Sequence, residues 1–280
     1  MIKRYKDFAE VAEEIREGTH PIVYKFRTWE DNYHKRIITD REAWFAHPHS
    51  LNDPYDVRPP YNFVIGEIDW DKARNKIRQA GKAFEPDLTD QELESEVELR
   101  IEDIQTDPVA YFQRTRGEYI LDKSNYDKIG IFSCCTSSEN EPMWAYYGNN
   151  HYGFAVGFNT VELSRALQCT VGYVNYDDTP VNYYILGDNR GLMENEIFQK
   201  ATHWKTEEEL RFITAGIGLI RERASKFPVQ AVSEIVFGLN TSQQAQEEIM
   251  VAAAKSLPGI PFYQIKTRPD SYGFEKVRIG

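Results

Sequence analysis

Residues 204–214 have the sequence WKTEEELRFIT, in which three consecutive glutamates lead into a short apolar run. The part from Glu208 to Thr214 is rich in residues that favour β-strands, and we expect a strand that begins at the acidic residues. Glu207 and Glu209 are two positions apart, and at the start of a strand this spacing directs both side chains to one face. The stretch therefore predicts a strand with a pair of carboxylates at its entrance.

Segments of similar character lie on both sides of this stretch. Further strands are expected at residues 21–27, 43–47, 129–137, 153–158, 169–176, 232–239 and 261–266, and helices at 32–39, 143–147, 161–167, 193–203 and 242–256. Elements of both kinds must bury their apolar faces against one another around a common core. We predict an α+β fold in which a central mixed or mainly antiparallel sheet, either continuous or split into two halves, is flanked by helices.

The chain is expected to form a single domain over residues 1–280, with a helical insertion at residues 69–127. Inside the insertion, Leu93, Val97, Ile101 and Ile104 follow a helical spacing among many charged residues. A further amphipathic helix is expected at Tyr5–Glu17, because apolar residues recur there at helical spacing and Gly18 follows.

The composition narrows the classes of function. A formal net charge of −11 argues against extensive non-specific binding to nucleic acid, which depends on Lys and Arg side chains. The longest apolar runs are too short to cross a membrane, and acidic residues interrupt the N-terminus where a secretory signal would be apolar. The three cysteines form neither a disulfide framework nor a Cys-x-x-Cys metal motif. We expect a cytoplasmic protein without a membrane partner and, among its site residues, no metal ligands.

A series of short motifs, spread in order over nearly the whole chain, resembles a bacterial family known only as domain of unknown function 2971. The motifs are Tyr24–Arg27, Leu51–Asp56, Phe132-Ser133, Met143-Trp144-x-x-Tyr147-x-x-x-His151-x-Gly153, Trp204-x-x-Glu207-x-Glu209-x-Arg211 and Ile235–Asn240. Proteins of this family are similar to ones found beside bacterial defence genes. The resemblance thus implies a role against phage, but no reaction.

The Glu-x-Glu pair also resembles, more distantly, the catalytic strand of ADP-ribosyltransferases. By that resemblance Glu209 would stabilise the reacting ribose of NAD and Glu207 would assist. Lys25 or Arg27 on the first strand would hold the phosphates, and Ser133 would border the cofactor. The sequence departs from those enzymes in lacking a Ser-Thr-Ser motif and in offering both a Lys and an Arg on the first strand. The competing interpretation of the two glutamates is a solvated strand entrance in which Glu209 pairs with Arg211.

Four other residues are candidates for the same site. Asp53 lies in the turn before Pro54 and could face a ribose, while Trp144 and Tyr147 are spaced to line a pocket with their rings. His151 lies in a loop where an imidazole can act as a catalytic group near neutral pH. Core packing explains Trp144 equally, because its spacing is also typical of a core-facing helix.

These patterns lead to one principal hypothesis and two alternatives. The principal hypothesis is an NAD-using defence effector that transfers ADP-ribose to a protein or nucleic-acid acceptor, or that cleaves NAD. The first alternative is a non-enzymatic sensor or scaffold that binds a phage or host partner through residues 144–153. The second is a metal-dependent nuclease, which requires Asp53, Asp56, Glu207 and Glu209 to converge on a cation.

Overall fold

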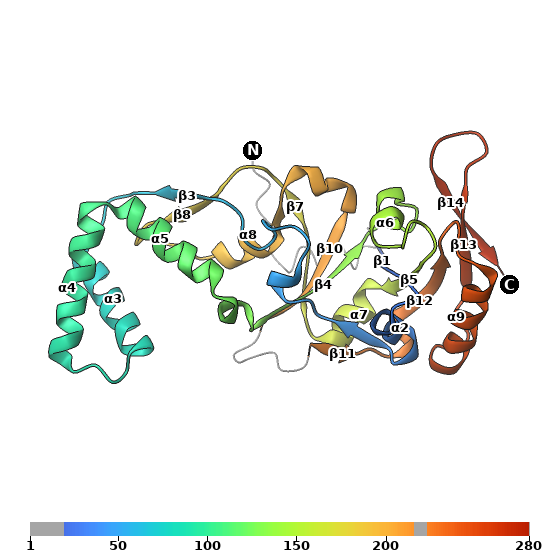
Figure 1. Cartoon of the computed structure of the whole chain (residues 1–280), viewed down its shortest axis with the longest axis horizontal. Helices are drawn as coiled ribbons and strands as arrows, with labels where there is room; N and C mark the ends of the chain where they lie inside the picture. The colour runs from blue at the N-terminus through green and yellow to red at the C-terminus, as the bar shows by residue number, and fades with distance from the viewer. Residues whose placement is uncertain (1–19, 216–222, 280) are drawn as a thin grey trace. The chain divides into compact units, whose positions relative to one another are not determined.

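The computed structural model describes residues 20–215 and 223–279 (Figure 1). The helix expected at Tyr5–Glu17 lies outside the described residues. No helix within residues 20–215 and 223–279 has the length and apolar character of a membrane span.

The described residues form two compact units. Unit 1 contains those within 1–53, 126–177 and 200–280, and unit 2 contains residues 54–125 and 178–199. The expectation of a single domain over residues 1–280 with an insertion at 69–127 stays a prediction. All the residues that form the site described below belong to unit 1.

An eight-stranded sheet forms the centre of unit 1, in the order β14-β13-β12-β5-β1-β4-β10-β6 (Figure 1). Its strands are β1 (Ile22–Arg27), β4 (Ile129–Cys135), β5 (Phe154–Asn159), β6 (Thr170–Tyr173), β10 (Glu209–Ala215), β12 (Val232–Phe237), β13 (Phe262–Thr267) and β14 (Phe274–Ile279). Strands β12 and β13 pair in parallel, and all the other neighbours pair antiparallel. The predicted α+β class, with a mixed and mainly antiparallel sheet flanked by helices, is confirmed.

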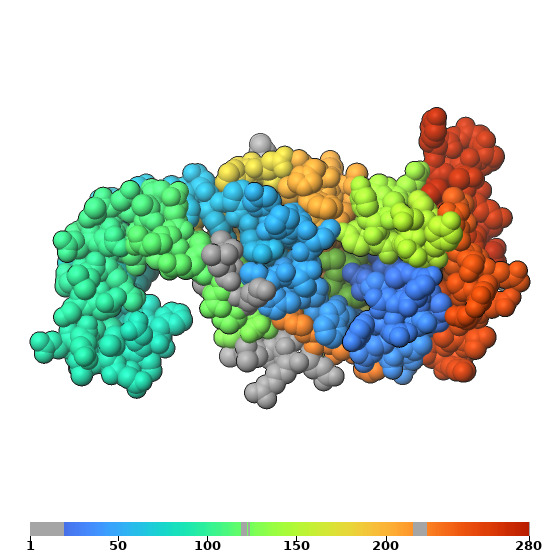
Figure 2. Space-filling view, viewed as in Figure 1, coloured from blue at the N-terminus to red at the C-terminus, as the bar shows by residue number. Residues whose placement is uncertain are grey.

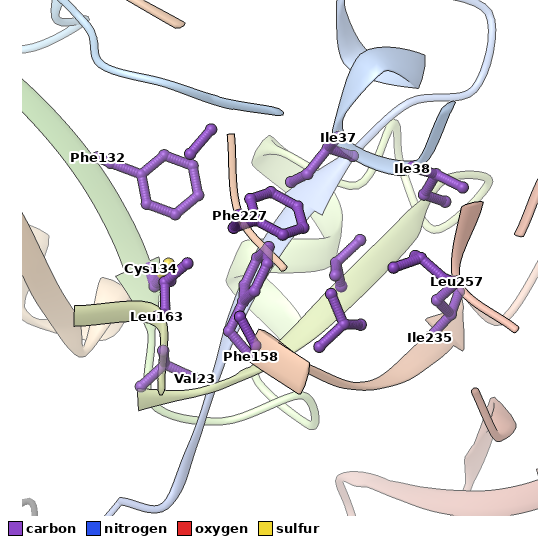
Figure 3. Packing of buried hydrophobic residues seen from close by; sticks show 14 of the residues in the cluster. Val23, Ile37, Ile38, Phe132, Cys134, Phe158, Leu163, Phe227, Ile235 and Leu257 are labelled. Carbon is purple, nitrogen blue, oxygen red and sulfur yellow. The ribbon is translucent and has the colours of Figure 1, made fainter. Parts of the chain in front are cut away.

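One face of this sheet carries the main hydrophobic core of unit 1. Alternate residues of the strands point into it, including Val23, Phe132, Cys134 and Phe158, all at most 2% exposed (Figure 3). The covering helices are α2 (Asn32–Thr39), α7 (Thr160–Leu167) and α9 (Gln243–Ser256), which contribute the buried residues Ile37, Ile38, Leu163, Ile249, Ala253 and Leu257. We call this side the helix-covered face.

A smaller cluster occupies the opposite face. Tyr24 and Phe26 of β1 pack there with Cys135 of β4 and with Trp144 of the short helix α6 (Glu141–Tyr146). The remaining elements of unit 1 are β2 (Glu42–Trp44), η1 (Pro48–Ser50), β7 (Asn175–Tyr176), η3 (Thr202–Glu207), β11 (Ala224–Lys226) and η4 (Val229–Ala231).

Unit 2 consists mainly of helices. Its helices are α3 (Trp70–Phe84), α4 (Asp90–Thr106), α5 (Pro108–Leu121) and α8 (Leu192–Phe198), and its strands β3 (Tyr61–Val64) and β8 (Val181–Tyr184) pair in parallel. A capping box at Thr89 and Glu92 begins α4. The apolar stripe predicted at Leu93, Val97, Ile101 and Ile104 is buried on α4, with each residue at most 2% exposed.

The structure differs from the sequence predictions at three places that matter for the site. The helix expected at residues 193–203 ends at Phe198, and the short strand β9 (Gln199–Lys200) follows it. The strand expected at 169–176 is interrupted at Val174, whose amide donates a hydrogen bond to the carbonyl of Glu209 (3.0 Å). Strand β14 was not predicted, because three of its six residues are charged, as is common at a sheet edge.

Candidate functional site

The central sheet opens between β1 and β4. Strand β1 is paired with β5 along its whole length, from Ile22 to Arg27, and β4 is paired with β10 from Ile129 to Cys135. Between β1 and β4 the register contains one pair, Tyr24 with Cys135. The sheet is thus continuous but has a local split at this junction, and side chains can enter the gap.

The register also decides which of the predicted site residues share a face. Tyr24, Cys135 and Glu209 are successive partners across β1, β4 and β10, so their side chains point to the same side, opposite the helix-covered face. Ser133 and Arg211 are partners on that side too. Lys25 and Arg27 alternate with Tyr24 and therefore point to the helix-covered face.

Two buried carboxylates and two buried cations form an ion-paired group on the side of Glu209. This group, here called the carboxylate cluster, consists of Glu207, Glu209, Lys200 and Arg211, which are 4%, 6%, 5% and 0% exposed. Arg211 donates to both oxygens of Glu209, from Nε to Oε1 (2.8 Å) and from Nη2 to Oε2 (3.0 Å). Lys200 Nζ donates to Glu207 Oε2 (2.6 Å) and to Glu209 Oε2 (3.4 Å).

Glu207 reaches this cluster from a different element than the sequence predicted. It is the last residue of η3, and Glu208 follows in a left-handed conformation with a φ of 46°. Strand β10 begins only at Glu209. The strand therefore begins one residue later than expected, and the strand-like alternation expected to direct both side chains to one face does not hold, because the turn at Glu208 separates them. Lys200 brings the two carboxylates together instead.

A chain of side-chain hydrogen bonds leads from the carboxylate cluster toward the surface. The hydroxyl of Tyr147 donates to Glu207 Oε1 (2.6 Å) and accepts a hydrogen bond from the Asn52 amide (3.0 Å). Asn52 is exposed and Tyr147 is half-buried. Glu207 therefore has a hydrogen-bonded connection to the exposed surface.

The surroundings of Glu209 and of Tyr147 shift the pKa values of these two side chains. Burial acts to raise the pKa of Glu209, but the charges of Arg211 and Lys200 and the hydrogen bonds from Arg211 and Ser133 outweigh it and hold the pKa below its ordinary value. Burial and the neighbouring Glu207 raise the pKa of the Tyr147 hydroxyl. Glu209 is thus ionised and Tyr147 is protonated at neutral pH.

Lys25 enters the split between β1 and β4 from the other face. Its Nζ donates to the backbone carbonyl of Ser133 (2.6 Å) and lies 5.0 Å from the centre of the Phe132 ring. Burial and the adjacent positive charge of Arg27 lower the pKa of Lys25 to about 7, although the charges of Glu209 and Glu207 act in the opposite direction. Lys25, Ser133 and Glu209 thus meet at the split, whereas the sequence predicted only their order along the chain.

The other predicted site residues lie elsewhere in unit 1. Trp144 is fully buried in the small cluster, and its indole nitrogen donates to the carbonyl of Ser138 (2.7 Å). The ring of His151 packs edge-on against Phe274 (5.5 Å between centroids), on the hairpin of β13 and β14. Asp53 is 2% exposed and does not present its carboxylate at the surface.

Sequence reasoning missed Lys200 and Asn52. Lys200 was assigned to a helix, where nothing in its neighbours marked it as a partner for two glutamates. Only the end of α8 at Phe198 and the turn into η3 bring it to them. Asn52 was noted only as part of the Leu51–Asp56 motif, and its contact with Tyr147 spans 95 positions of the chain.

Metal ligands do not gather in the parts of the chain that the structure describes. There, no group of three or more His, Cys, Asp and Glu side chains could hold a metal ion. Glu207 and Glu209 are joined by Lys200, and the convergence with Asp53 and Asp56 that a metal-dependent nuclease requires is not found.

A family of known sequences matches the part of the chain that contains the carboxylate cluster. No curated protein and no solved structure matches the chain. Residues 143–212 match the model of a family described as "Protein of unknown function (DUF2971)", and this segment contains Tyr147 and all four members of the carboxylate cluster.

Proposed function

We propose that this chain is an NAD-using enzyme of bacterial defence, which transfers ADP-ribose to an acceptor or cleaves NAD in the cytoplasm. The observation that carries the proposal is the meeting of Lys25, Ser133 and Glu209, from three neighbouring strands, at the split between β1 and β4. Lys25 would hold a phosphate of the cofactor, and Ser133 would border its ribose.

The hydrogen bonds of the two carboxylates assign them different roles. An ionised carboxylate offers about four acceptor positions. Glu209 already accepts from Arg211 twice, from Lys200 and from Ser133. Glu207 accepts from Lys200 and Tyr147 and retains capacity for a ligand hydroxyl. We therefore assign the contact with the reacting ribose to Glu207 and the anchoring of the cluster to Glu209, the reverse of the order that the resemblance implies.

In the proposed reaction Glu207 is the carboxylate beside the reacting ribose. The bond between ribose C1′ and the nicotinamide nitrogen breaks, and its electron pair leaves with neutral nicotinamide. The resulting oxocarbenium-like centre is stabilised by the negative charge of Glu207. A bond forms between C1′ and the oxygen of water or of an acceptor hydroxyl, whose proton passes to Glu207. Tyr147 would orient Glu207 through its hydrogen bond.

Release of nicotinamide from NAD tests this proposal, with purified full-length chain alone and with bacterial lysate as a source of acceptors. Glu207→Gln should reduce the rate at least about a hundredfold, the scale typical of removing one charge-stabilising group. The matched control is Glu208→Gln, since Glu208 is the exposed residue between the two buried glutamates and should leave the rate unchanged. Absence of nicotinamide release and of transferred ADP-ribose from the wild type would refute the proposal.

One further observation favours the alternative of a partner-binding protein. Tyr146 and Tyr152, on either side of the loop after α6, are 69% and 52% exposed. Between them Asn149, Asn150 and His151 all have left-handed backbone conformations, with φ of 50°, 49° and 72°. Such conformations cost energy and often occur at functional loops. Helix α6 and this loop lie at the surface in the space-filling view (Figure 2, yellow-green). Loss of partner binding in Tyr152→Ala, with NAD turnover absent, would select this alternative.

A further inference from the structure

Three basic side chains gather on the helix-covered face, away from the carboxylate cluster. Lys25 and Arg27 point to that face from β1, and His34 lies in the first half of α2. The three lie near one another, because Lys25 and Arg27 are two residues apart on one face of β1 and His34 Nδ1 accepts a hydrogen bond from the amide of Thr28, the residue after Arg27 (3.4 Å). In keeping with this, Arg27 lowers the pKa of both Lys25 and His34, and Lys25 also lowers that of His34. We call these three residues the basic cluster. Phe132 and Cys134 of β4 point to the same face (Figure 3).

The basic cluster has almost no negative charge to balance it. In the described parts of the chain no carboxylate lies within 4.0 Å of the terminal nitrogens of Lys25 or Arg27, which donate instead to the carbonyls of Ser133 and Phe26. Asp31 is the near acid, and its Oδ1 caps α2 by accepting from the amides of Tyr33 and His34. Burial lowers the pKa of Arg27 to about 10, an effect that the Cys134 thiol and Asp31 only partly offset. Charges buried in this way are costly unless something pairs with them.

Donors in the cluster remain available for an anion. Lys25 uses one of its three N–H groups on Ser133 and Arg27 uses one of its five on Phe26. Nδ1 of His34 accepts from the amide of Thr28 (3.4 Å), so the proton of the neutral ring lies on Nε2. All three side chains are half-buried, so they are both desolvated and reachable from solvent.

We propose that Lys25, Arg27 and His34 bind a phosphate group on the helix-covered face of the sheet. A planar guanidinium matches two phosphate oxygens, and the ammonium and the imidazole supply single donors beside it. The phosphate belongs either to a free phosphate or phosphomonoester, or to the pyrophosphate of a dinucleotide. In the second case Lys25, which also enters the split toward Ser133, connects this site with the carboxylate cluster. The dinucleotide case rests on the proposed function, whereas binding of a free phosphate or a phosphomonoester does not depend on the NAD reaction.

Titration calorimetry with inorganic phosphate, on the full chain in a phosphate-free buffer, tests the site. Wild type should bind saturably, and Arg27→Met should weaken binding by about tenfold or more, the loss of one charge-assisted pair. The matched control Arg165→Met, at a 68% exposed side chain on α7, should bind as the wild type does. Near-ultraviolet circular dichroism verifies that Arg27→Met is folded, and Lys25→Met provides a second variant with the same expected direction.

Two further titrations identify the source of the phosphate and the charge that binds it. ADP-ribose that displaces phosphate, and that itself loses affinity in Arg27→Met, assigns the site to a dinucleotide; failure to displace assigns it to a free phosphate or a phosphomonoester. Sulfate keeps one charge state between pH 6 and pH 8 and should bind several-fold more tightly at pH 6, because Lys25, with a pKa of about 7, is then protonated. Among the groups that act on these residues, burial raises the pKa of Cys134 to about 12, and the pKa values of Asp31 and Glu209 are held below their ordinary values, so these three keep one charge state over that range. Burial and the charge of Arg27 lower the pKa of His34 from its ordinary 6.5, which moves its change of charge toward the lower end of the range. No saturable binding by wild type, or undiminished binding by Arg27→Met, would overturn the proposal, whereas the proposed reaction stands or falls separately, by nicotinamide release from NAD.

Discussion

At the split between β1 and β4, buried charges are paired on one face of the sheet and largely unpaired on the other. On one face, Glu207 and Glu209 are matched by Lys200 and Arg211, so that two negative charges meet two positive ones. On the helix-covered face, no carboxylate of the described residues lies within 4.0 Å of the terminal nitrogens of Lys25 or Arg27. Asp31, which acts on Arg27, is engaged in capping α2, and Glu207 and Glu209 act on Lys25 from the opposite side of the sheet. The first arrangement is complete by itself, whereas the second becomes balanced only when an anion binds. The pairing of buried charges therefore distinguishes a cluster that stabilises the fold from one that is suited to bind an anion.

Removal of one cation from each cluster should give the largest difference between them. Arg211→Met leaves Glu209 buried with only Lys200 and Ser133, and we expect a loss of about 3–5 kcal/mol in the free energy of unfolding. Arg27→Met removes an unbalanced charge, and without phosphate in the buffer it should be neutral or stabilise by up to about 1 kcal/mol. Urea unfolding of both variants provides the measurement.

The exposed pair of Arg165 with Glu162 supplies the control for this contrast. Arg165 is 68% exposed, and Arg165→Met should change the free energy of unfolding by less than about 0.5 kcal/mol. Equal losses in Arg211→Met and Arg27→Met would show that both clusters stabilise the fold, and the distinction between the two faces would fail.

The sequence predicted which strands form this region and not how their side chains meet. The class of the fold and the positions of β1, β4 and β10 follow from period-two patterns and β-forming residues, which act locally. The meeting of Lys25, Ser133 and Glu209 was predicted only as an order along the chain. It depends on β1 and β4 being neighbours that pair at one position. That register is a tertiary property.

The contacts of Lys200 and His34 likewise could not be predicted from the sequence. Lys200 follows an expected helix, and its place between two carboxylates depends on where α8 ends. His34 lies in a helix that was predicted at its observed bounds, and still its proximity to Arg27 came from the turn of the chain after β1. Alternation could have placed Lys25 and Arg27 on one face, but only the pairing of Tyr24 with Cys135 shows that Glu209 lies on the other.

The unpaired charge of Lys25 should also make the free energy of unfolding depend on pH, with a smaller effect than the substitution of Arg211. The pKa of Lys25 is about 7 in the folded chain, below its ordinary value of 10.5. Between these two values the unfolded state binds more protons than the folded state, so stability rises as pH increases and the penalty is fully present below the folded pKa. From pH 7 to pH 9 the wild type should gain roughly 1 kcal/mol relative to Lys25→Met, after allowance for partial exposure to solvent. Parallel stability curves for the two proteins would contradict this expectation.

The smallest effect is expected at the exposed end of the carboxylate cluster. Tyr147→Phe removes the donor to Glu207 and the acceptor of Asn52, and should lower the free energy of unfolding by about 1 kcal/mol. Tyr146→Phe is the matched control, since Tyr146 is the neighbouring tyrosine, is 69% exposed and should show no change.

A double-mutant cycle tells whether this hydroxyl acts through Glu207. In the Glu207→Gln background the amide still accepts a hydrogen bond but carries no charge, so the cost of Tyr147→Phe should fall to roughly half. If Tyr147 orients Glu207, the two substitutions are coupled, and the measured coupling is the energy available to hold the carboxylate toward a ligand. If the cost of Tyr147→Phe is the same in both backgrounds, Tyr147 acts through Asn52 or through its ring, and the route from the surface to the carboxylate cluster does not pass through its hydroxyl.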